Sequence, residues 1–415
     1  MTDVSTLRAN GTRLWERIMA IGEIGETAKG GSNRQALTDE DRRGRELFLS
    51  WAGDAGCSTR VDEIGNLFVR RPGSQDLPPV LIGSHLDTQP TGGKFDGILG
   101  VLGGLEVIET LNDADVRTEH PIEVAVWTNE EGARFDVAMM GSAVWSGAMP
   151  LDEARALVDR AGVSVGEELE RTGYRGAEPA QPFPLAAAFE LHIEQGPVLE
   201  DAGITIGIVR GVQHMSRHRI VVEGQECHAG PTPMNLRKDP VMALARFLPE
   251  VYAIADAHAP EGRVTIGCME ARPGSGNTVP GELEITVDLR HPDEQQYQAM
   301  VDACEAAVAG ACSALGLAVT QRRVWHAPGV EFAEPCIDAV REAVQITGHD
   351  ALEMVSGAGH DACNVSRVAP TSMIFIPCRD GISHNEAEWA TEAHCAAGTD
   401  VLLHAVLAAA RASPA

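Results

Sequence analysis

Apolar runs of strand length recur along this chain, and several end in a short loop that carries imidazole or carboxylate side chains. VLIGSH is a short run typical of a buried strand, GILGVLGGLEVIETLND has a helical period, and IEVAVWT is a second strand. This β-α-β alternation predicts an α/β fold with a mostly parallel sheet and covering helices. Ligands of such sheets bind beyond the carboxyl ends of the strands.

The pattern changes near residue 212, where a segment with the order β-α-β-β-α-β begins. This order is typical of the ferredoxin-like arrangement. The helix–strand pattern of the first part resumes afterwards, so the segment reads as an insertion. We therefore expect a discontinuous catalytic domain, residues 1–212 and 329–415, and an inserted α+β lid domain, residues 213–328.

Near the start, residues 4–20 and 38–56 read as amphipathic helices, and VDEIGNLFVRR alternates like one strand. Between the helices, GEIGETAKGGSN is glycine-rich and predicts a loop, a candidate rim of a site.

Composition restricts the partners and the compartment. Lys and Arg number 33 against 60 Asp and Glu, a net charge of −27, which argues against nucleic acid and anionic membranes but not against a small anionic substrate. Nine scattered cysteines without a CxxC pair indicate a reducing cytoplasm, with neither a disulfide framework nor a redox motif. The sequence has no apolar signal core at its start and no run of about 18 apolar residues, so we expect no membrane span.

Metal-ligand side chains gather on the loops that follow the apolar runs. A mixture of imidazoles and carboxylates suits two divalent ions of the zinc class, with one carboxylate left as a base. Zinc is the default, and manganese, cobalt or nickel also fit such donors. The candidates are His85, Asp87, Asp96, Glu130, Glu131, His192 and His384. The sequence therefore predicts a two-metal hydrolase.

Spacing suggests a role for some of these side chains. Asp96, on a Gly-flanked loop, is the best candidate to be shared by both ions. Asp87 lies two residues from His85, where its carboxylate can accept the second N–H of that histidine. Neighbouring side chains point in different directions at a strand end, so one of Glu130 and Glu131 can bind metal while the other acts as general base.

Seven motifs carry a resemblance that extends from about residue 10 to 410: GSHLDT, GGKFDGILGV, TNEEGARF, LHIEQGPVLE, HAGPTPM, SGAGHDA and ISHNEAEW. With them the chain resembles the peptidase M20 superfamily, and within it the amidase/hydantoinase/carbamoylase branch. The resemblance implies a dinuclear catalytic domain and an inserted lid that forms a homodimer.

The resemblance also implies a role for each residue. One metal would be held by His85, Asp96 and His192, and the other by Asp96, Glu131 and His384, with Glu130 as the general base. Peptidases of the superfamily usually have a carboxylate at the position of His192, so this histidine points to the carbamoylase branch.

Further residues would complete the pocket in this family. His228 would stabilise the oxyanion, often from the partner subunit, and Arg290 suits a substrate carboxylate because its N–H groups form a fork. Both a site role and a supporting role stay open for His360 and Asp361. The residues implied to contact substrate are Gln195, Asn277, Arg290, Gly357 and Gly359.

The expected reaction is hydrolysis of the ureido C–N bond of an N-carbamoyl amino acid, giving the amino acid, carbon dioxide and ammonia. Allantoate hydrolysis is the nearest alternative, and an aminoacylase or dipeptidase is another, against which His192 argues. A metal-free homologue that only binds a partner is an alternative from a different class, which metal analysis distinguishes.

Overall fold

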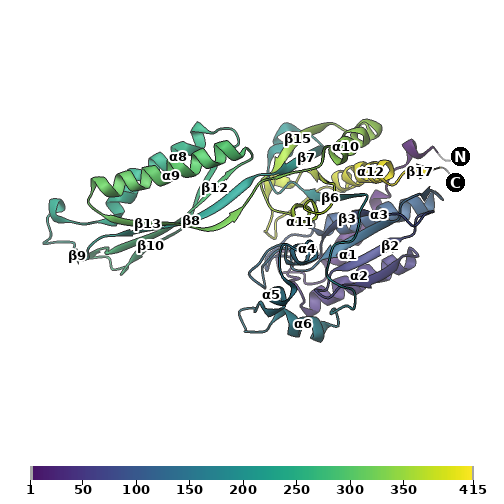
Figure 1. Cartoon of the computed structure of the whole chain (residues 1–415), viewed down its shortest axis with the longest axis horizontal. Coiled ribbons are helices and arrows are strands. Elements are labelled where there is room, and N and C mark those ends of the chain that lie inside the picture. Colours follow the sequence, from purple (N-terminus) through teal and green to yellow (C-terminus); the bar gives the residue numbers. More distant parts are fainter. Residues whose placement is uncertain (1–2, 414–415) are drawn as a thin grey trace. The chain divides into compact units, whose positions relative to one another are not determined.

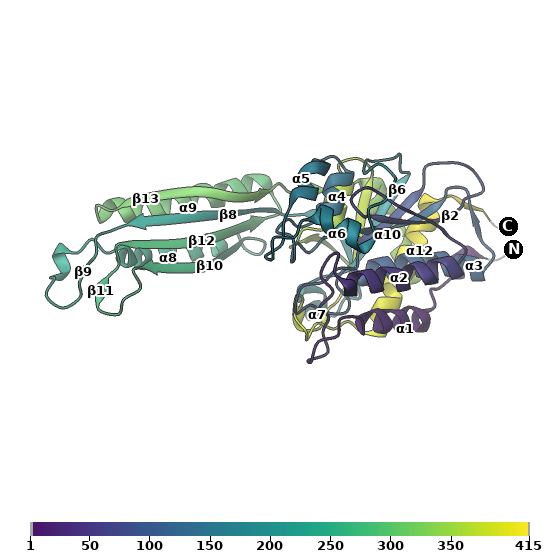
Figure 2. The ribbon, with the colours of Figure 1, turned by 90° about the horizontal axis from the view of Figure 1, so that it is seen from below.

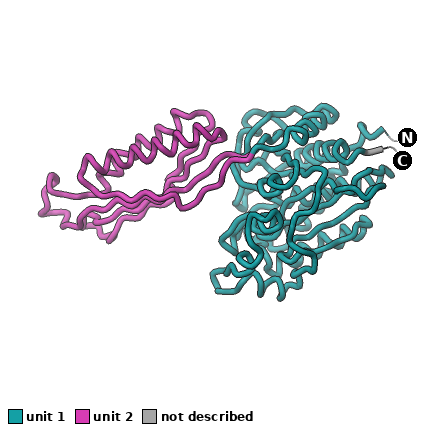
Figure 3. The backbone as a smooth tube through the Cα atoms, in the orientation of Figure 1, with its two compact units in different colours: residues 1–211, 331–415 teal, residues 212–330 magenta. Residues whose placement is uncertain are grey.

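The computed structural model describes residues 3–413 and divides into two compact units. Unit 1 contains residues 1–211 and 331–415, and unit 2 contains residues 212–330, as Figure 3 shows by colour. The chain thus leaves unit 1 once and returns to it. None of the helices in the described part of the chain combines the length and apolar character needed to cross a membrane.

A large sheet forms the centre of unit 1 (Figure 1). Within residues 3–413 it has nine strands in the order β1-β2-β5-β3-β6-β16-β7-β14, with β15 beside β7. The four central strands run parallel, and every residue in them is buried. They are β5 (Ile122–Trp127), β3 (Val80–His85), β6 (Ala187–Ile193) and β16 (Thr371–Ile376). The α/β fold with a mostly parallel central sheet is confirmed.

The outer strands of this sheet differ in part from the expectation. They are β1 (Ser58–Val61), β2 (Leu67–Arg71), β7 (Ile206–Val212), β14 (Val330–Glu331) and β15 (Ala351–Ser356). The single strand expected over VDEIGNLFVRR was wrong, because its first residue, Val61, ends β1 and its last five residues form β2, antiparallel to β1. The Asp62 carboxylate accepts hydrogen bonds from the N–H groups of Ile64 (3.0 Å) and Asn66 (2.9 Å), which closes a turn between them.

Helices pack against both faces of the sheet. The long ones are α1 (Gly11–Gly22), α2 (Asp39–Asp54), α3 (Ile98–Asp113), α10 (Glu334–Thr347) and α12 (Glu392–Ala409). Helix α3 lies tight against β6, since a Cβ atom at Gly100 would be 2.5 Å from the backbone oxygen of Leu191. The sequence patterns missed the short helices α4 (Met140–Trp145), α5 (Leu151–Ala156), α6 (Val165–Thr172), α7 (Val198–Ala202) and α11 (Asp361–Val365).

The helix expected over residues 4–20 begins only at Gly11, after a short 3-10 turn at Val4–Thr6. Asn10 caps it, because its side-chain oxygen accepts a hydrogen bond from the N–H of Arg13. The N–H of Ala9 donates to Asp400 and that of Asn10 donates to Glu106, so these amides are not available for an earlier helical turn.

Unit 2 is an antiparallel sheet with two helices along one face (Figure 2). Its elements are β8 (His214–Glu223), α8 (Pro240–Ala257), β10 (Arg263–Arg272), β12 (Glu282–His291), α9 (Glu294–Ala314) and β13 (Ala318–Ala327). The sheet order β10-β12-β8-β13 is the ferredoxin-like one. Phe247, Met300 and Ile285 belong to a core that this unit supplies by itself. A separate two-stranded ribbon joins β9 (Cys227–His228) to β11 (Thr278–Val279).

Candidate active site

The expected metal ligands of unit 1 come from strands that are neighbours in the sheet. His85 is the last residue of β3 and His192 lies near the end of β6. Glu130 and Glu131 follow β5, and His384 follows β16. Because β5, β3, β6 and β16 are parallel and adjacent, their carboxyl ends meet at one edge, as in other open α/β sheets.

Two histidines and one carboxylate oxygen converge at the first candidate metal position. The Oδ1 atom of Asp96 lies 3.5 Å from His85 Nε2 and 3.1 Å from His192 Nε2. The Nδ1 atoms of these histidines lie 2.9 Å from the Asp87 backbone oxygen and 2.8 Å from the Ile193 backbone oxygen. Each Nδ1 therefore donates, which leaves a lone pair on Nε2 facing the carboxylate. A carboxylate oxygen that faces two imidazole nitrogens is a donor set that suits a divalent ion, so this group could hold one.

A second group shares the same aspartate. The Oδ2 atom of Asp96 lies 3.4 Å from His384 Nε2, which is also 3.2 Å from Glu131 Oε2. Asp96 thus presents one carboxylate oxygen to each group, the arrangement expected of a carboxylate shared by two ions. Asp96 is buried, whereas the His384 side chain is 51% exposed.

In a third close group, Glu190 with His192 and His360, the glutamate and His360 Nε2 have hydrogen-bond partners outside the group. The Glu190 carboxylate accepts hydrogen bonds from Ser84 Oγ (2.9 Å) and from the N–H of Ala362 (2.8 Å). His360 Nε2 lies 2.9 Å from Ser356 Oγ, and burial lowers its pKa well below the ordinary value. The Asp361 carboxylate accepts a hydrogen bond from Ser142 Oγ. These contacts brace the loop before α11.

The Asp87 carboxylate lies elsewhere than expected. It is 3.9 Å from His85 Nδ1, which instead bonds to the Asp87 backbone oxygen. Its two oxygens accept hydrogen bonds from the N–H groups of Glu130 and Glu131, each at 3.2 Å. The expected hydrogen bond from His85 to the Asp87 carboxylate was therefore wrong. Asp87 orients His85 through its backbone oxygen, and it orients Glu130 and Glu131 through its side chain.

The two glutamates have different neighbours. Glu130 Oε2 lies 3.5 Å from His85 Nε2, and burial together with Asp361 and Glu131 raises the Glu130 pKa well above its ordinary value. A raised pKa suits a proton acceptor that works near neutral pH. Glu131 accepts hydrogen bonds from the N–H of Gln89 (3.1 Å) and from Gln89 Nε2 (2.8 Å). Burial and the Asp96 charge raise the Glu131 pKa to about 7.

Polar side chains that spacing alone did not predict surround Asp96. Gln195, expected to contact substrate, donates from Nε2 to Asp96 Oδ2 at 2.7 Å. Ser383 Oγ donates to the same oxygen at 2.8 Å. Ser383, Glu388 and Gln89 were missed, although the first two lie within the ISHNEAEW motif beside His384.

The other expected site residues lie on a loop of unit 1 and in unit 2. Gly357 and Gly359 lie between β15 and α11. In unit 2, His228 is exposed on β9, and the next residue, Ala229, donates its N–H to the Asn277 backbone oxygen at 2.9 Å. The Arg290 guanidinium already holds a carboxylate, since its Nε donates to Asp288 Oδ1 at 2.6 Å.

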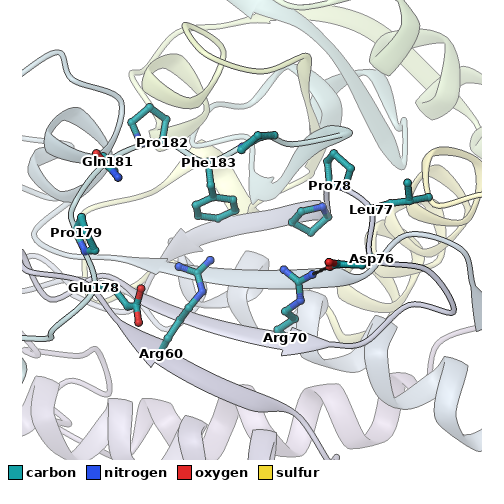
Figure 4. Close-up of a pocket in the computed structure, with 12 residues that line it drawn as sticks. Arg60, Arg70, Asp76, Leu77, Pro78, Glu178, Pro179, Gln181, Pro182 and Phe183 are labelled. Carbon is teal, nitrogen blue, oxygen red and sulfur yellow. Dashed lines mark ion pairs between the residues drawn. The ribbon is translucent and has the colours of Figure 1, made fainter.

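A cavity of about 460 Å³ elsewhere in unit 1 includes none of the expected metal ligands (Figure 4). Arg60 and Arg70 line it, with Phe183 above Arg60. Both guanidinium groups pair with the buried carboxylate of Glu123, Arg70 at 3.3 Å. The two cations of this cavity therefore share one buried carboxylate, and Arg70 also lies 3.9 Å from the exposed carboxylate of Asp76.

Comparison with known proteins agrees with the geometry. Residues 81–408 match the model of peptidase family M20/M25/M40. The chain is 46% identical to an N-carbamoyl-L-amino-acid amidohydrolase of Rhizobium meliloti, over 96% of each chain, and 33% identical to an allantoate amidohydrolase of Bacillus subtilis, over 89% of this chain and 90% of the relative. A crystal structure of an amidase of the hydantoinase/carbamoylase family from Burkholderia multivorans superposes with a TM-score of 0.95 at 49% identity, over 99% of this chain and 100% of that one. The chain belongs to peptidase family M20/M25/M40.

Proposed function

We propose that this protein is a metal-dependent amidohydrolase that cleaves the ureido C–N bond of N-carbamoyl-L-amino acids. The observation that carries the proposal is Asp96, which presents one oxygen to each of two groups of metal ligands, with Glu130 beside them. The substrate class rests on the amidohydrolase of Rhizobium meliloti, which matches nearly the full chain. His192 supports the same choice, as the peptidases of the superfamily usually have a carboxylate there.

Two divalent ions, zinc by default, would be held by His85, Asp96 and His192 and by Asp96, Glu131 and His384. When bound, such ions polarise a carbonyl group and lower the pKa of water. In the proposed reaction Glu130 accepts a proton from the attacking water and delivers it to the amino-acid nitrogen as the C–N bond breaks. The carbamic acid released then decomposes to carbon dioxide and ammonia.

We also propose roles for residues that orient the substrate. Arg290 binds the substrate carboxylate through its guanidinium, and His228 donates a hydrogen bond to the oxygen that gains negative charge. Gln195 and Asn277 hold the ureido group, and the loop with Gly357 and Gly359 offers peptide N–H groups. Residues 213–328 would serve as lid and dimerisation domain. The nine free thiols suit the reducing cytoplasm that we propose as the compartment.

A substrate panel tests the reaction. The protein is stripped of metal with a chelator, reloaded with zinc, manganese, cobalt or nickel, and given N-carbamoyl-L-amino acids, N-carbamoyl-β-alanine, allantoate and a dipeptide. We expect the N-carbamoyl-L-amino acids to be cleaved fastest and only after reloading. Faster cleavage of allantoate would mean that this protein shares the activity named for the Bacillus subtilis relative. Full turnover without metal would refute the proposed mechanism.

Two isosteric variants test which glutamate accepts the proton and which binds metal. Glu130→Gln should keep both ions yet lower kcat by roughly 10²–10⁴-fold, because it removes the proton acceptor. Glu131→Gln should weaken metal binding instead. Metal content and kcat are measured on both variants, and the opposite pattern would exchange the two roles.

A further inference from the structure

One buried carboxylate holds the loop that carries Asp96, although it is not itself a candidate ligand. Glu388 is 3% exposed. Its Oε1 atom accepts hydrogen bonds from the N–H of Phe95 (3.0 Å) and of Asp96 (3.1 Å). A Cβ atom at Gly93 would lie 2.0 Å from the same oxygen, so the glycine lets the loop close around the carboxylate. The backbone of Asp96 is thus held by a side chain 292 residues later in the chain.

The other oxygen of Glu388 reaches the second group of ligands through a hydroxyl. Ser383 Oγ lies 2.9 Å from Glu388 Oε2 and 2.8 Å from Asp96 Oδ2, and its single proton is shared between these two oxygens. Ser383 immediately precedes His384. One carboxylate therefore ties together the two chain segments that supply Asp96 and His384, whose ligand atoms are 3.4 Å apart.

The two groups depend on this tie to different degrees. His85 and His192 lie on buried central strands, and backbone oxygens fix both imidazoles. His384 lies on an irregular loop with a φ of 53°, and its side chain is half exposed. A ligand on a loop relies on its neighbours for position more than a ligand on a strand.

We infer that Glu388 is a positioning residue that sets the geometry of Asp96, which both groups share, and of His384, so that the second ion depends on it more than the first, whose two histidines lie on strands. The inference rests on the proposed function, since it presumes two ions. Loss of Glu388 should weaken binding of the second ion more than binding of the first. Residues that orient metal ligands typically change metal affinity by about 10- to 100-fold.

The test is a titration of the metal-free protein with zinc by calorimetry, with the cobalt-loaded visible spectrum as an independent readout. The parent should bind two ions. Glu388→Ala should bind the second ion at least about tenfold more weakly, and should lose less affinity for the first ion, which keeps both of its strand histidines. Glu388→Gln keeps an oxygen for the two peptide N–H groups but donates toward Ser383, so it should show a smaller loss, again mainly at the second ion. Ser383→Ala, which keeps the contacts to Phe95 and Asp96, should resemble Glu388→Gln.

Glu392→Gln, an exposed glutamate four residues further on, is the matched control and should bind both ions like the parent. If Glu388→Ala does not fold by circular dichroism, Glu388→Gln and Ser383→Ala decide the question. Parent-like affinity for both ions in these variants, equal weakening of both ions, or a parent that binds fewer than two ions would overturn the inference. A parent that binds two ions but leaves every N-carbamoyl substrate intact would overturn the proposed reaction and leave the role of Glu388 standing.

Discussion

At the scale of single residues, the ligand loops contain backbone conformations that L-residues seldom adopt. Asn129, Gln195 and His384 have φ values of 57°, 59° and 53°. Asn129 precedes the expected base Glu130, His384 is itself an expected ligand, and Gln195 donates to Asp96. Left-handed non-glycine residues cost on the order of 1 kcal/mol or more and persist where their surroundings fix them. The strained backbone of these loops thus occurs where the side chains of the expected site must point in particular directions.

Gly97 is a glycine that the first group of ligands requires. Its φ is 71°, and a Cβ atom there would lie 2.4 Å from His85 Cε1 and Nε2. Gly97→Ala should displace the His85 imidazole and lower the metal content below that of the parent, as measured by plasma mass spectrometry. Gly53→Ala, where a Cβ atom meets nothing within 4 Å, should keep the parent's content. Full metal occupancy in Gly97→Ala would show that the loop can make room.

His404 should make the folded state sensitive to mild acid. It is 4% exposed on α12, its Nε2 lies 3.1 Å from the Leu7 backbone oxygen, and burial, with Arg8 nearby, lowers its pKa from 6.5. The folded protein therefore binds fewer protons than the unfolded chain, so stability is lost as pH falls below about 6.5. His404→Asn should lose less of its Tm between pH 7.5 and pH 5.5 than the parent does. Equal losses would rule out this linkage.

At the scale of elements, helix α9 offers a stabilising change in unit 2. Gly310 lies in its exposed part, and a Cβ atom there would meet nothing within 4 Å. Gly310→Ala should raise the free energy of unfolding of unit 2 by about 0.5–1 kcal/mol, because alanine loses less backbone entropy in a helix. Unfolding in urea measures this change in the free energy of unfolding. Gly316→Ala should destabilise instead, because Gly316 has a φ of 65°. A gain at both positions would contradict the argument.

Sequence patterns predicted the strands that are buried along their whole length. The runs that became β3 and β5 are mostly apolar and are buried throughout, so a pattern of hydrophobicity identified them and placed His85 and Glu130 at or just after their ends. The patterns failed where side chains shape the backbone, as at the Asn10 cap and the Asp62 turn. They also could not find Glu388, since its partners Phe95 and Asp96 are distant in sequence.

At the scale of the whole molecule, the proposed homodimer has a functional test. If His228 acts on the partner's site, two inactive variants should complement each other. His228→Ala is mixed with Glu130→Gln under conditions that exchange subunits, so each mixed dimer has one site with both functions intact. Activity should approach about a quarter of the parent's, as random pairing across a two-fold interface predicts. No recovery despite demonstrated exchange would mean that His228 serves its own subunit or none.

The sheet order of unit 1 has a consequence for the newborn chain. Strands β6 and β7 are consecutive in sequence, yet β16 lies between them and pairs with both. The ribosome makes β16 and His384 only after all of unit 2. Until then the β6 edge is unpaired on that side, and such edges invite aggregation. Translation that stops early therefore yields a polypeptide without His384 and with an open β-edge, a form that chaperones and proteases readily recognise.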